Sequence, residues 1–299
     1  MHRLVVLVIL SILILLGSGC SRTEFAYRHA DWLLEYQAQR IVAANASQRD
    51  LWQPVLAGTL AHHREDELPL VIAYLDLART GIGQADSTIN AACLVDGALL
   101  LYQRHARLAV GLSVPLLSTL DAAQLKHLAG FMQQRQEKAV NEYLNPDLEE
   151  RKMARQQRFV GRIENWTGNL NDQQRQQIND ALVHIPDLSA PWLAYRLQQT
   201  NTLLEMLETG SSAAALREFL TDWWVEMDGH STESSLQWQR AKQQFILMLD
   251  TLNATLTDNQ RNRVVQRLTG LHVDLARFLP TSQPPRSTSL AASCASSTV

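Results

Sequence analysis

The chain is short of residues that interrupt helices. Its 299 residues include 13 glycines and 9 prolines, and such small numbers disfavour a turn-rich β fold. Cysteine is also scarce, because besides Cys20 only Cys93 and Cys294 are present. Two cysteines do not make a disulfide framework. With 46% apolar residues, the sequence therefore favours a helical protein that folds around an ordinary hydrophobic core.

The sequence also lacks a strong charge of either sign and the usual catalytic motifs. Its formal net charge is -3, which gives no broad electrostatic attraction to nucleic acid. It contains no Gly-x-Ser-x-Gly elbow, no phosphate-binding P-loop and no dinucleotide-binding glycine pattern. We therefore expect a protein that is not an enzyme, needs no cofactor and binds no nucleic acid.

The N-terminus carries the longest apolar run of the chain. Residues 4–16 are apolar except for one serine, and this run is shorter than the about 20 residues that a membrane-spanning helix needs. A basic residue, Arg3, precedes the run and small residues follow it, which is typical of a secretory signal segment. We interpret residues 1–19 as a signal peptide.

Cys20 follows Gly17-Ser18-Gly19, an order that resembles the lipobox of bacterial lipoproteins. The resemblance implies that Cys20 receives a diacylglyceryl group and an N-acyl chain such as palmitate, which together anchor a protein firmly to a membrane. In such proteins an aspartate after the cysteine retains the protein at the inner membrane, so Ser21 indicates export to the outer membrane, facing the periplasm. The alternative is a plain signal anchor with an incidental cysteine.

Apolar residues recur at the helical period through most of the chain. The clearest stripe consists of Val264, Leu268, Leu271, Leu275 and Phe278. No run alternates apolar and polar residues over the length of a strand. We predict an all-α fold, an elongated multi-helix bundle of about nine or ten helices, over residues 20–280. Two abutting bundles that meet near residue 145 are the alternative, and residues 281–299 are predicted to be a disordered tail.

A short pattern marks the expected helix starts. It recurs as Leu120-Asp121-Ala122-Ala123-Gln124, Leu170-Asn171-Asp172-Gln173-Gln174, Leu256-Thr257-Asp258-Asn259-Gln260 and Ala44-Asn45-Ala46-Ser47-Gln48. In each copy the polar cap residue accepts a hydrogen bond from an amide of the first turn, and the glutamine three residues later returns a bond to the amide of the cap. The pattern thus predicts four capping boxes without any shared chemistry.

Prolines and glycines mark the expected helix ends. Asn145-Pro146 predicts the end of one helix, because proline disfavours helix in the residue before it. Thr80-Gly81-Ile82-Gly83 predicts the end of the first long helical region. Pro54 and Pro69 fall inside helical patterns, and we expect a kink or a break at each.

The densest polar cluster is His62-His63-Arg64-Glu65-Asp66-Glu67. On an α-helix His62 shares a face with Asp66, and His63 with Glu67. Such pairs can hold a divalent metal, but two histidines four residues apart, as on a catalytic zinc helix, are missing. We therefore predict a solvated charged turn rather than a metal site, with a metal-dependent hydrolase that uses the His62–Glu67 cluster as the alternative.

A network of five residues is the other candidate site: Arg28, Asp31, His63, Arg64 and Glu67. The first two residues lie near the expected anchor and the others one long helix later, so ion pairs between them would join the two helices. Buried charges must be paired, and we favour a structural clamp over a ligand site.

Tryptophans are concentrated in the C-terminal half of the chain, at Trp192, Trp223, Trp224 and Trp238. Neighbouring tryptophans on a helix point about 100° apart, so at least one of Trp223 and Trp224 is expected to be partly exposed. Exposed aromatic residues often mark binding surfaces. We favour packing of all of them in the core or near the membrane, with a binding surface as the alternative.

Several stretches of the chain resemble the DUF6279 family of proteobacterial lipoproteins. They are Cys20-Ser21-Arg22-Thr23-Glu24-Phe25-Ala26-Tyr27-Arg28, Asp31-Trp32-Leu33-Leu34, His62-His63-Arg64-Glu65-Asp66-Glu67-Leu68-Pro69 and Asn141-Glu142-Tyr143-Leu144. The resemblance spans most of the mature domain and implies an envelope protein, but it implies no mechanism. In addition, Leu256-Thr257-Asp258-Asn259-Gln260 is similar to the Leu-Thr-x-x-Gln motif of small periplasmic chaperones of the Spy and CpxP kind.

Together these patterns predict a lipid-anchored, periplasm-facing helical protein of the binding or scaffold type. A chaperone-like activity is a narrower version of this hypothesis. The expected partners are the membrane, through the lipid anchor, and a protein or lipid that binds to grooves between helices.

Overall fold

A computed structural model describes residues 22–83, 90–226 and 232–280 of the chain. The predicted signal peptide, Cys20 and the predicted tail lie outside these residues. Within the described part every regular element is a helix, and no strand occurs. The all-α prediction is confirmed, and the number of helices is close to the nine or ten expected.

The helices follow one another with short connections. The first half comprises α2 (Arg22–Arg28), α3 (Ala30–Val42), α4 (Ala46–His62), the π-helix η1 (His63–Glu67), α5 (Leu68–Gly83), α6 (Ala91–Leu117) and α7 (Ala122–Tyr143). The second half comprises α8 (Leu148–Thr167), α9 (Asp172–His184), α10 (Ser189–Glu208), α11 (Ala213–Thr221), the π-helix η2 (Asp222–Glu226), α12 (Thr232–Thr255) and α13 (Asp258–Ala276).

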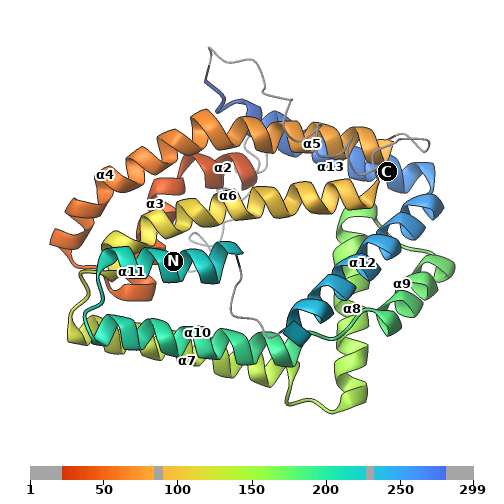
Figure 1. Ribbon diagram of the computed structural model, residues 1–299. Helices are drawn as coiled ribbons and strands as arrows, with labels where there is room; N and C mark the ends of the chain where they lie inside the picture. Colours follow the sequence, from red (N-terminus) through yellow and green to blue (C-terminus); the bar gives the residue numbers. More distant parts are fainter. Residues whose placement is uncertain (1–21, 84–89, 227–231, 281–299) are drawn as a thin grey trace, which may run out of the picture.

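The helices pack mainly in pairs (Figure 1). α5 packs against α13 along one side of the molecule, and α7 packs against α10 along the opposite side. α8, α9 and α12 group together at one end, where α12 also reaches α6. Segments far apart in the sequence are thus neighbours, and the apolar stripe predicted for the last helix faces α5.

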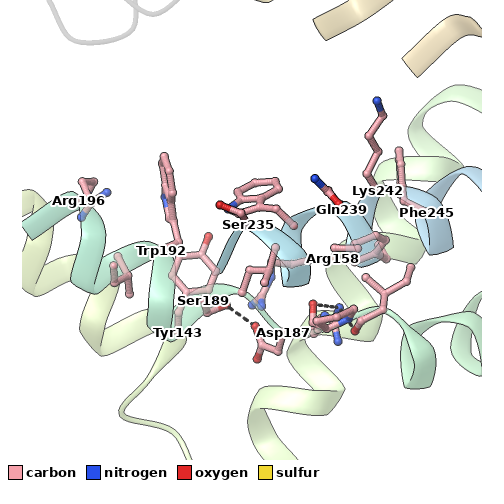
Figure 2. Close-up of a pocket in the computed structure, with 18 of the residues that line it drawn as sticks. Tyr143, Arg158, Asp187, Ser189, Trp192, Arg196, Ser235, Gln239, Lys242 and Phe245 are labelled. Atoms are coloured by element: carbon pink, nitrogen blue, oxygen red, sulfur yellow. Dashed lines mark hydrogen bonds between the residues drawn. The ribbon is translucent and has the colours of Figure 1, made fainter. Parts of the chain in front are cut away.

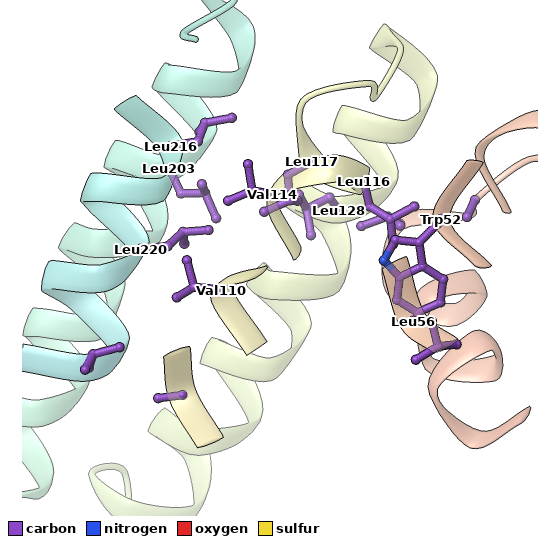
Figure 3. Packing of buried hydrophobic residues seen from close by; sticks show 14 residues of the cluster. Trp52, Leu56, Val110, Val114, Leu116, Leu117, Leu128, Leu203, Leu216 and Leu220 are labelled. Carbon is purple, nitrogen blue, oxygen red and sulfur yellow. The ribbon is translucent and has the colours of Figure 1, made fainter. Parts of the chain in front are cut away.

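The largest core cluster joins α4, α6, α7, α10 and α11 (Figure 3). Val114 of α6 and Leu220 of α11 are almost fully buried in it, and Trp52 of α4 donates a hydrogen bond from its indole nitrogen to the Leu112 carbonyl at 2.8 Å. Trp223 and Trp224, of which at least one was expected to be partly exposed, pack against this cluster and are partly buried. Burial of apolar side chains at about 25 cal/mol per Å² is the main force that holds these helices together.

Two smaller clusters lie elsewhere. One joins α8, α9 and α12 through Ile178, Met248 and their neighbours, and the other joins α5 and α13 through Leu75 and Leu268. The largest cluster contains residues from both sides of residue 145. The domain boundaries themselves, including the alternative of two bundles, stay a prediction.

All four predicted capping boxes are formed. The caps are Asn45, Asp121, Asn171 and Thr257, and each is bonded reciprocally to the glutamine three residues later. These contacts satisfy amides at the helix starts that would otherwise lack a partner. The sequence interpretation of this recurring pattern is therefore confirmed.

The structure adds a contact between the capping boxes that the sequence did not predict. The side-chain amides of Gln174 and Gln260 exchange two hydrogen bonds, each of 2.9 Å, and those of Gln48 and Gln124 exchange bonds of 3.0 and 2.7 Å. All four glutamines are buried. Each pair thus ties two helix starts together deep in the fold, where a lost partner is costly.

One predicted helix end can be compared with the structure, because α7 ends at Tyr143 before Asn145-Pro146. α5 continues through Thr80-Gly81-Ile82 to Gly83, the last residue of its described range. Pro69 follows the π-helix η1, in which the Leu68 amide bonds to the His63 carbonyl five residues earlier. A wider turn fits this position, because the ring of a proline clashes with the carbonyl four residues before it in a regular α-helix. α4 continues through Pro54 without a break.

None of the helices in the described ranges combines the length and apolarity that crossing a membrane requires.

Candidate functional site

An open cleft of about 950 Å³ lies where α8, α10 and α12 meet, next to α6 and α7. Its lining consists of Val95, Leu99, Ala139, Tyr143, Arg155, Arg158, Phe159, Arg162, Ile185, Pro186, Asp187, Leu188, Ser189, Trp192, Leu193, Arg196, Glu226, Ser235, Trp238, Gln239, Ala241, Lys242 and Phe245. The lining is predominantly apolar. The volume of the cleft is in the range of about 300–1,000 Å³ that is typical of small-molecule sites.

Aromatic side chains form much of the apolar wall. Trp192 of α10 and Trp238 of α12 meet edge to face, with ring centroids 6.2 Å apart, and Phe159 of α8 meets Phe245 of α12 in the same way at 6.5 Å. Figure 2 shows Trp192 and Arg196 on α10 at the left of the cleft, and Gln239, Lys242 and Phe245 on α12 at the right. Two of the tryptophans singled out in the sequence therefore belong to one cleft.

Basic side chains at the cleft are held in place by neighbouring oxygens. Arg155 donates to the carbonyls of Ile185 and Pro186, at 2.8 and 3.1 Å, at the end of α9. Burial lowers the pKa of Arg155 below its usual value. Arg196 donates twice to the side-chain oxygen of Gln136, at 2.7 and 3.0 Å. These two arginines thus have structural partners.

The acidic groups at the cleft are also engaged. Asp187 accepts a hydrogen bond of 3.0 Å from the Ser189 amide. Burial raises the pKa of Asp187, but the hydrogen bonds from Ser189 and the charges of Arg155 and Arg151 together lower it below its usual value. Glu226 pairs with Arg107 at 2.9 Å. Both carboxyl groups therefore have partners, and neither is placed as a free acid or base.

Arg158 and Arg162 differ from the other cations of the cleft. They lie four residues apart on α8, so they share one face of the helix. The guanidinium of Arg158 lies 4.8 Å from the ring centroid of Tyr143. Neither arginine forms a hydrogen bond or ion pair with another residue in the part of the chain that the structure describes.

A second polar cluster surrounds η1, where the sequence predicted a charged turn. Tyr27 contacts His63 through a hydroxyl-to-Nδ1 distance of 2.9 Å, and the Nε2 atoms of His63 and His105 are 3.1 Å apart. Nδ1 of His105 lies 2.6 Å from the Leu101 carbonyl. Because a carbonyl only accepts, neutral rings place the protons so that Tyr27 donates to His63, His63 to His105, and His105 to Leu101.

Two members of this chain of hydrogen bonds, His63 and Tyr27, have shifted pKa values. Burial and the neighbouring His105 lower the pKa of His63 to about 4, against the weaker opposing effect of Glu67. Burial raises the pKa of Tyr27 to about 12. Both groups are therefore neutral at pH 7, which agrees with the direction of the bonds.

The predicted network of five residues is not formed as expected. Glu67 is buried and accepts two hydrogen bonds from Arg104, at 2.6 and 2.8 Å, while Arg28 pairs with Glu24 at 2.7 Å. Asp31 and Arg64 are exposed, and within the described ranges neither forms an ion pair. The sequence could not predict Arg104 as the partner because α6 reaches η1 only through the tertiary fold.

The π-helical turn also changes the pairs predicted for the polar cluster. His62 contacts Asp66 at 2.9 Å as expected, but His63 points to Tyr27 and His105 instead of Glu67. A π-turn places residues five apart on one face, and His62 accordingly lies 3.7 Å from Glu67. In the described segments, no three His, Cys, Asp or Glu residues are arranged to hold a metal ion.

The basic residues of the cleft were not identified from the sequence, although a readable pattern exists. Arg151, Arg155, Arg158 and Arg162 recur every three or four residues along α8, which places them on one side of a helix. The pattern indicates a basic face but not what lies opposite, and the opposing walls come from distant segments.

The fold and the cleft together define an all-α protein with an open, aromatic-walled cleft. The chain belongs to a family of unknown function (DUF6279), whose model matches residues 41–226. The matched region includes the cleft walls from α6, α7, α8 and α10. No curated protein and no solved structure matches the chain. Its lipoprotein nature and its likeness to the Spy and CpxP chaperones stay predictions.

Proposed function

We propose that the protein is a lipid-anchored binding protein of the bacterial envelope that accommodates an apolar ligand in the cleft between α8, α10 and α12. The observation that carries the proposal is the cleft itself. An open volume of about 950 Å³ with a mostly apolar lining has the size and composition of a ligand site. The carboxyl groups at the cleft have partners, and this supports binding rather than acid–base chemistry.

Contacts within the walls support the same proposal. Trp192 and Trp238, which contact each other, are each attached to a long helix. Arg155 connects α8 to the end of α9 through backbone carbonyls. A site whose walls are ordered before binding loses less conformational entropy when the ligand enters. An apolar compound is therefore expected to bind without refolding of the surrounding helices.

The location is proposed from the N-terminal sequence. Cys20 would carry the acyl chains, and the cleft would face the periplasm from the outer membrane. Replacement by Cys20→Ala is expected to abolish incorporation of labelled palmitate and to release the protein from the membrane fraction. Unchanged processing and membrane attachment of this variant would contradict the lipid anchor, but would not affect the cleft.

Photolabelling tests the binding proposal. The full-length protein is reconstituted in phosphatidylcholine nanodiscs and exposed to a diazirine derivative of dodecanol, and labelled peptides are identified by mass spectrometry. We expect label on peptides of α8, α10 and α12, and saturation of this label by unmodified dodecanol. Label that is spread over the surface and does not saturate would contradict the proposal.

A pair of matched variants makes this experiment specific. Ala139→Trp adds a large side chain at a position on α7 that lines the cleft, and it is expected to remove most of the saturable label. Ala57→Trp adds the same side chain at an exposed position on α4, and it is expected to leave the label unchanged. Far-UV circular dichroism checks that both variants remain folded.

A further inference from the structure

The charges around the cleft are unbalanced in a way that identifies the ligand more closely. Among the described residues its lining includes five basic side chains and two acidic ones, so their formal charge is five minus two, or +3, whereas the whole chain carries -3. Positive charge is thus concentrated at this apolar cleft. Such a concentration attracts an anion and raises its local concentration.

Three of these five cations have hydrogen-bond or ion-pair partners in the fold. Lys242 pairs with Asp96 at 2.5 Å, Arg155 donates to backbone carbonyls and lies near Asp187, and Arg196 donates to an amide oxygen. Arg158 and Arg162 remain, and no carboxylate within the described residues neutralises either of them. Among the described residues, the cations of the lining that have neither a carboxylate nor a hydrogen-bond partner therefore share one face of α8, whereas Arg196 on α10 also lacks a carboxylate but is bonded to Gln136.

The surroundings of Arg158 leave its hydrogen-bond donors available. Its guanidinium lies against the ring of Tyr143, and such a contact uses the π face of the ring rather than the N–H groups. Arginine donors match the oxygens of a carboxylate or phosphate in pairs. With Arg162 one helical turn away, the two side chains provide a site for a single anionic group with several oxygens.

We propose that the cleft binds a single-chain lipid with an anionic head, whose phosphate or carboxylate contacts Arg158 and Arg162 and whose acyl chain lies against Trp192, Trp238 and Phe245. This inference rests on the proposed function, because it specifies the ligand of the same cleft. It assigns the polar end of the ligand to α8 and the apolar end to the contact between α10 and α12.

The size of the cleft favours an acyl chain over a helix of a partner protein. A helix is about 10 Å wide and rises about 5.4 Å per turn, so roughly two turns would fill the whole volume. Helices that bind in grooves use anchor residues over at least that length, from i to i+7, so a helix would fill the whole cleft and leave no space for an anion beside Arg158 and Arg162. An acyl chain is thinner and fits beside the aromatic rings.

Competition against the photolabel tests the inference. The full-length protein in phosphatidylcholine nanodiscs is labelled with the dodecanol derivative, and submicellar dodecyl phosphate and dodecanol are compared as competitors. Both carry the same chain, so their difference measures the contribution of the anionic head. We expect the concentration of dodecyl phosphate that halves the label to be at least about tenfold lower than that of dodecanol at low salt, because charge-assisted hydrogen bonds hold the head. This difference is expected to shrink at high salt.

Charge variants locate the head group. In the double variant Arg158→Gln/Arg162→Gln, the two competitors are expected to become equal while dodecanol itself still competes. The control Arg217→Gln/Arg240→Gln removes the same charge from exposed positions outside the cleft and is expected to keep the preference. The variant Arg158→Lys/Arg162→Lys, which keeps the positive charge, is expected to keep part of the preference for dodecyl phosphate.

The outcomes separate this inference from the proposed function. If both competitors act equally on the wild type, or if the control pair abolishes the preference as strongly as the cleft pair, the anionic-head assignment is wrong and the binding proposal stands. If neither compound reduces the label, the proposed function itself is wrong. Stronger competition by an acidic 18-residue amphipathic peptide than by dodecyl phosphate would overturn the choice of a lipid.

Discussion

The paired glutamines at the helix starts allow a sharp test of the fold. Gln174 is 1% exposed, and its side-chain nitrogen donates to the Thr255 carbonyl at 2.8 Å and to the side-chain oxygen of Gln260 at 2.9 Å. Its oxygen accepts from the Asn171 amide and from Gln260. Substitution Gln174→Glu keeps the shape and the two accepted bonds but removes both donated ones.

The expected cost follows from the two bonds that are lost. The Thr255 carbonyl would be left without this donor, at about 1–3 kcal/mol for an unsatisfied group, and the side-chain oxygen of Gln260, which keeps its bond from the Thr257 amide, would lose a bond worth about 0.5–1.5 kcal/mol. The positive end of the α9 dipole would return about 0.3–1 kcal/mol to a carboxylate in the first turn. We therefore expect Gln174→Glu to lower the free energy of unfolding by about 0.5–4 kcal/mol at pH 7.

The neighbouring Gln173→Glu is a matched control. Gln173 lies in the same first turn of α9 but is exposed, so the change is expected to be neutral or to stabilise slightly. Urea unfolding at pH 7, followed by circular dichroism at 222 nm, measures both variants. At pH 4 the buried carboxyl group gains a proton and can donate again, so the deficit of Gln174→Glu should narrow. Equal stability of the two variants at pH 7 would refute the reasoning.

Three further predictions concern other parts of the molecule. The pKa of His63 is about 4 in the fold and about 6.5 when unfolded, so between these pH values only the unfolded chain gains this proton, and stability is lost as pH falls from 6.5 to 4. Solvent screening of the half-buried ring reduces the full effect of about 3 kcal/mol to about 1.5 kcal/mol. Urea titrations at pH 7 and pH 4 should therefore show a smaller loss of stability for His63→Gln than for the wild type. Glu67→Gln leaves the partly exposed Arg104 without its ion pair and is expected to cost about 1–3 kcal/mol, measured by urea unfolding; a cost like that of Glu65→Gln, which is exposed, would contradict it. Gly168 has a φ of 81°, so Gly168→Ala should destabilise by about 1–3 kcal/mol, whereas Gly130→Ala, inside α7 and with open space around it, should stabilise by about 0.5–1 kcal/mol; thermal melts with the opposite order would refute this argument.

Local sequence patterns predicted the helices and their ends because these depend on nearby residues. Thr257 and Gln260 form their capping box through contacts three residues apart, and Asn145-Pro146 acts on the helix directly before it. The exchange of bonds between Gln174 and Gln260 could not be predicted, because it joins residues 86 positions apart. The pairing of Arg104 with Glu67 was missed for the same reason.

The cleft could be predicted only in part. The sequence offered Trp192 and Trp238 as a possible binding surface, although packing in the core or near the membrane was the favoured interpretation, and the spacing of Arg158 and Arg162 can be read on α8. The sequence alone could not bring these residues to one cavity, since its walls come from separate helices whose arrangement is set by core packing. The π-turn at η1 was missed because its wider hydrogen bonding is a response to the structure around Pro69.

A crystal structure of the full-length protein with dodecyl phosphate tests the central claim most directly. We predict the phosphate within hydrogen-bond distance of Arg158 and Arg162, with the chain between Trp192 and Trp238. A dodecyl chain bound elsewhere, or a cleft that protein side chains close in the complex, would contradict the claim.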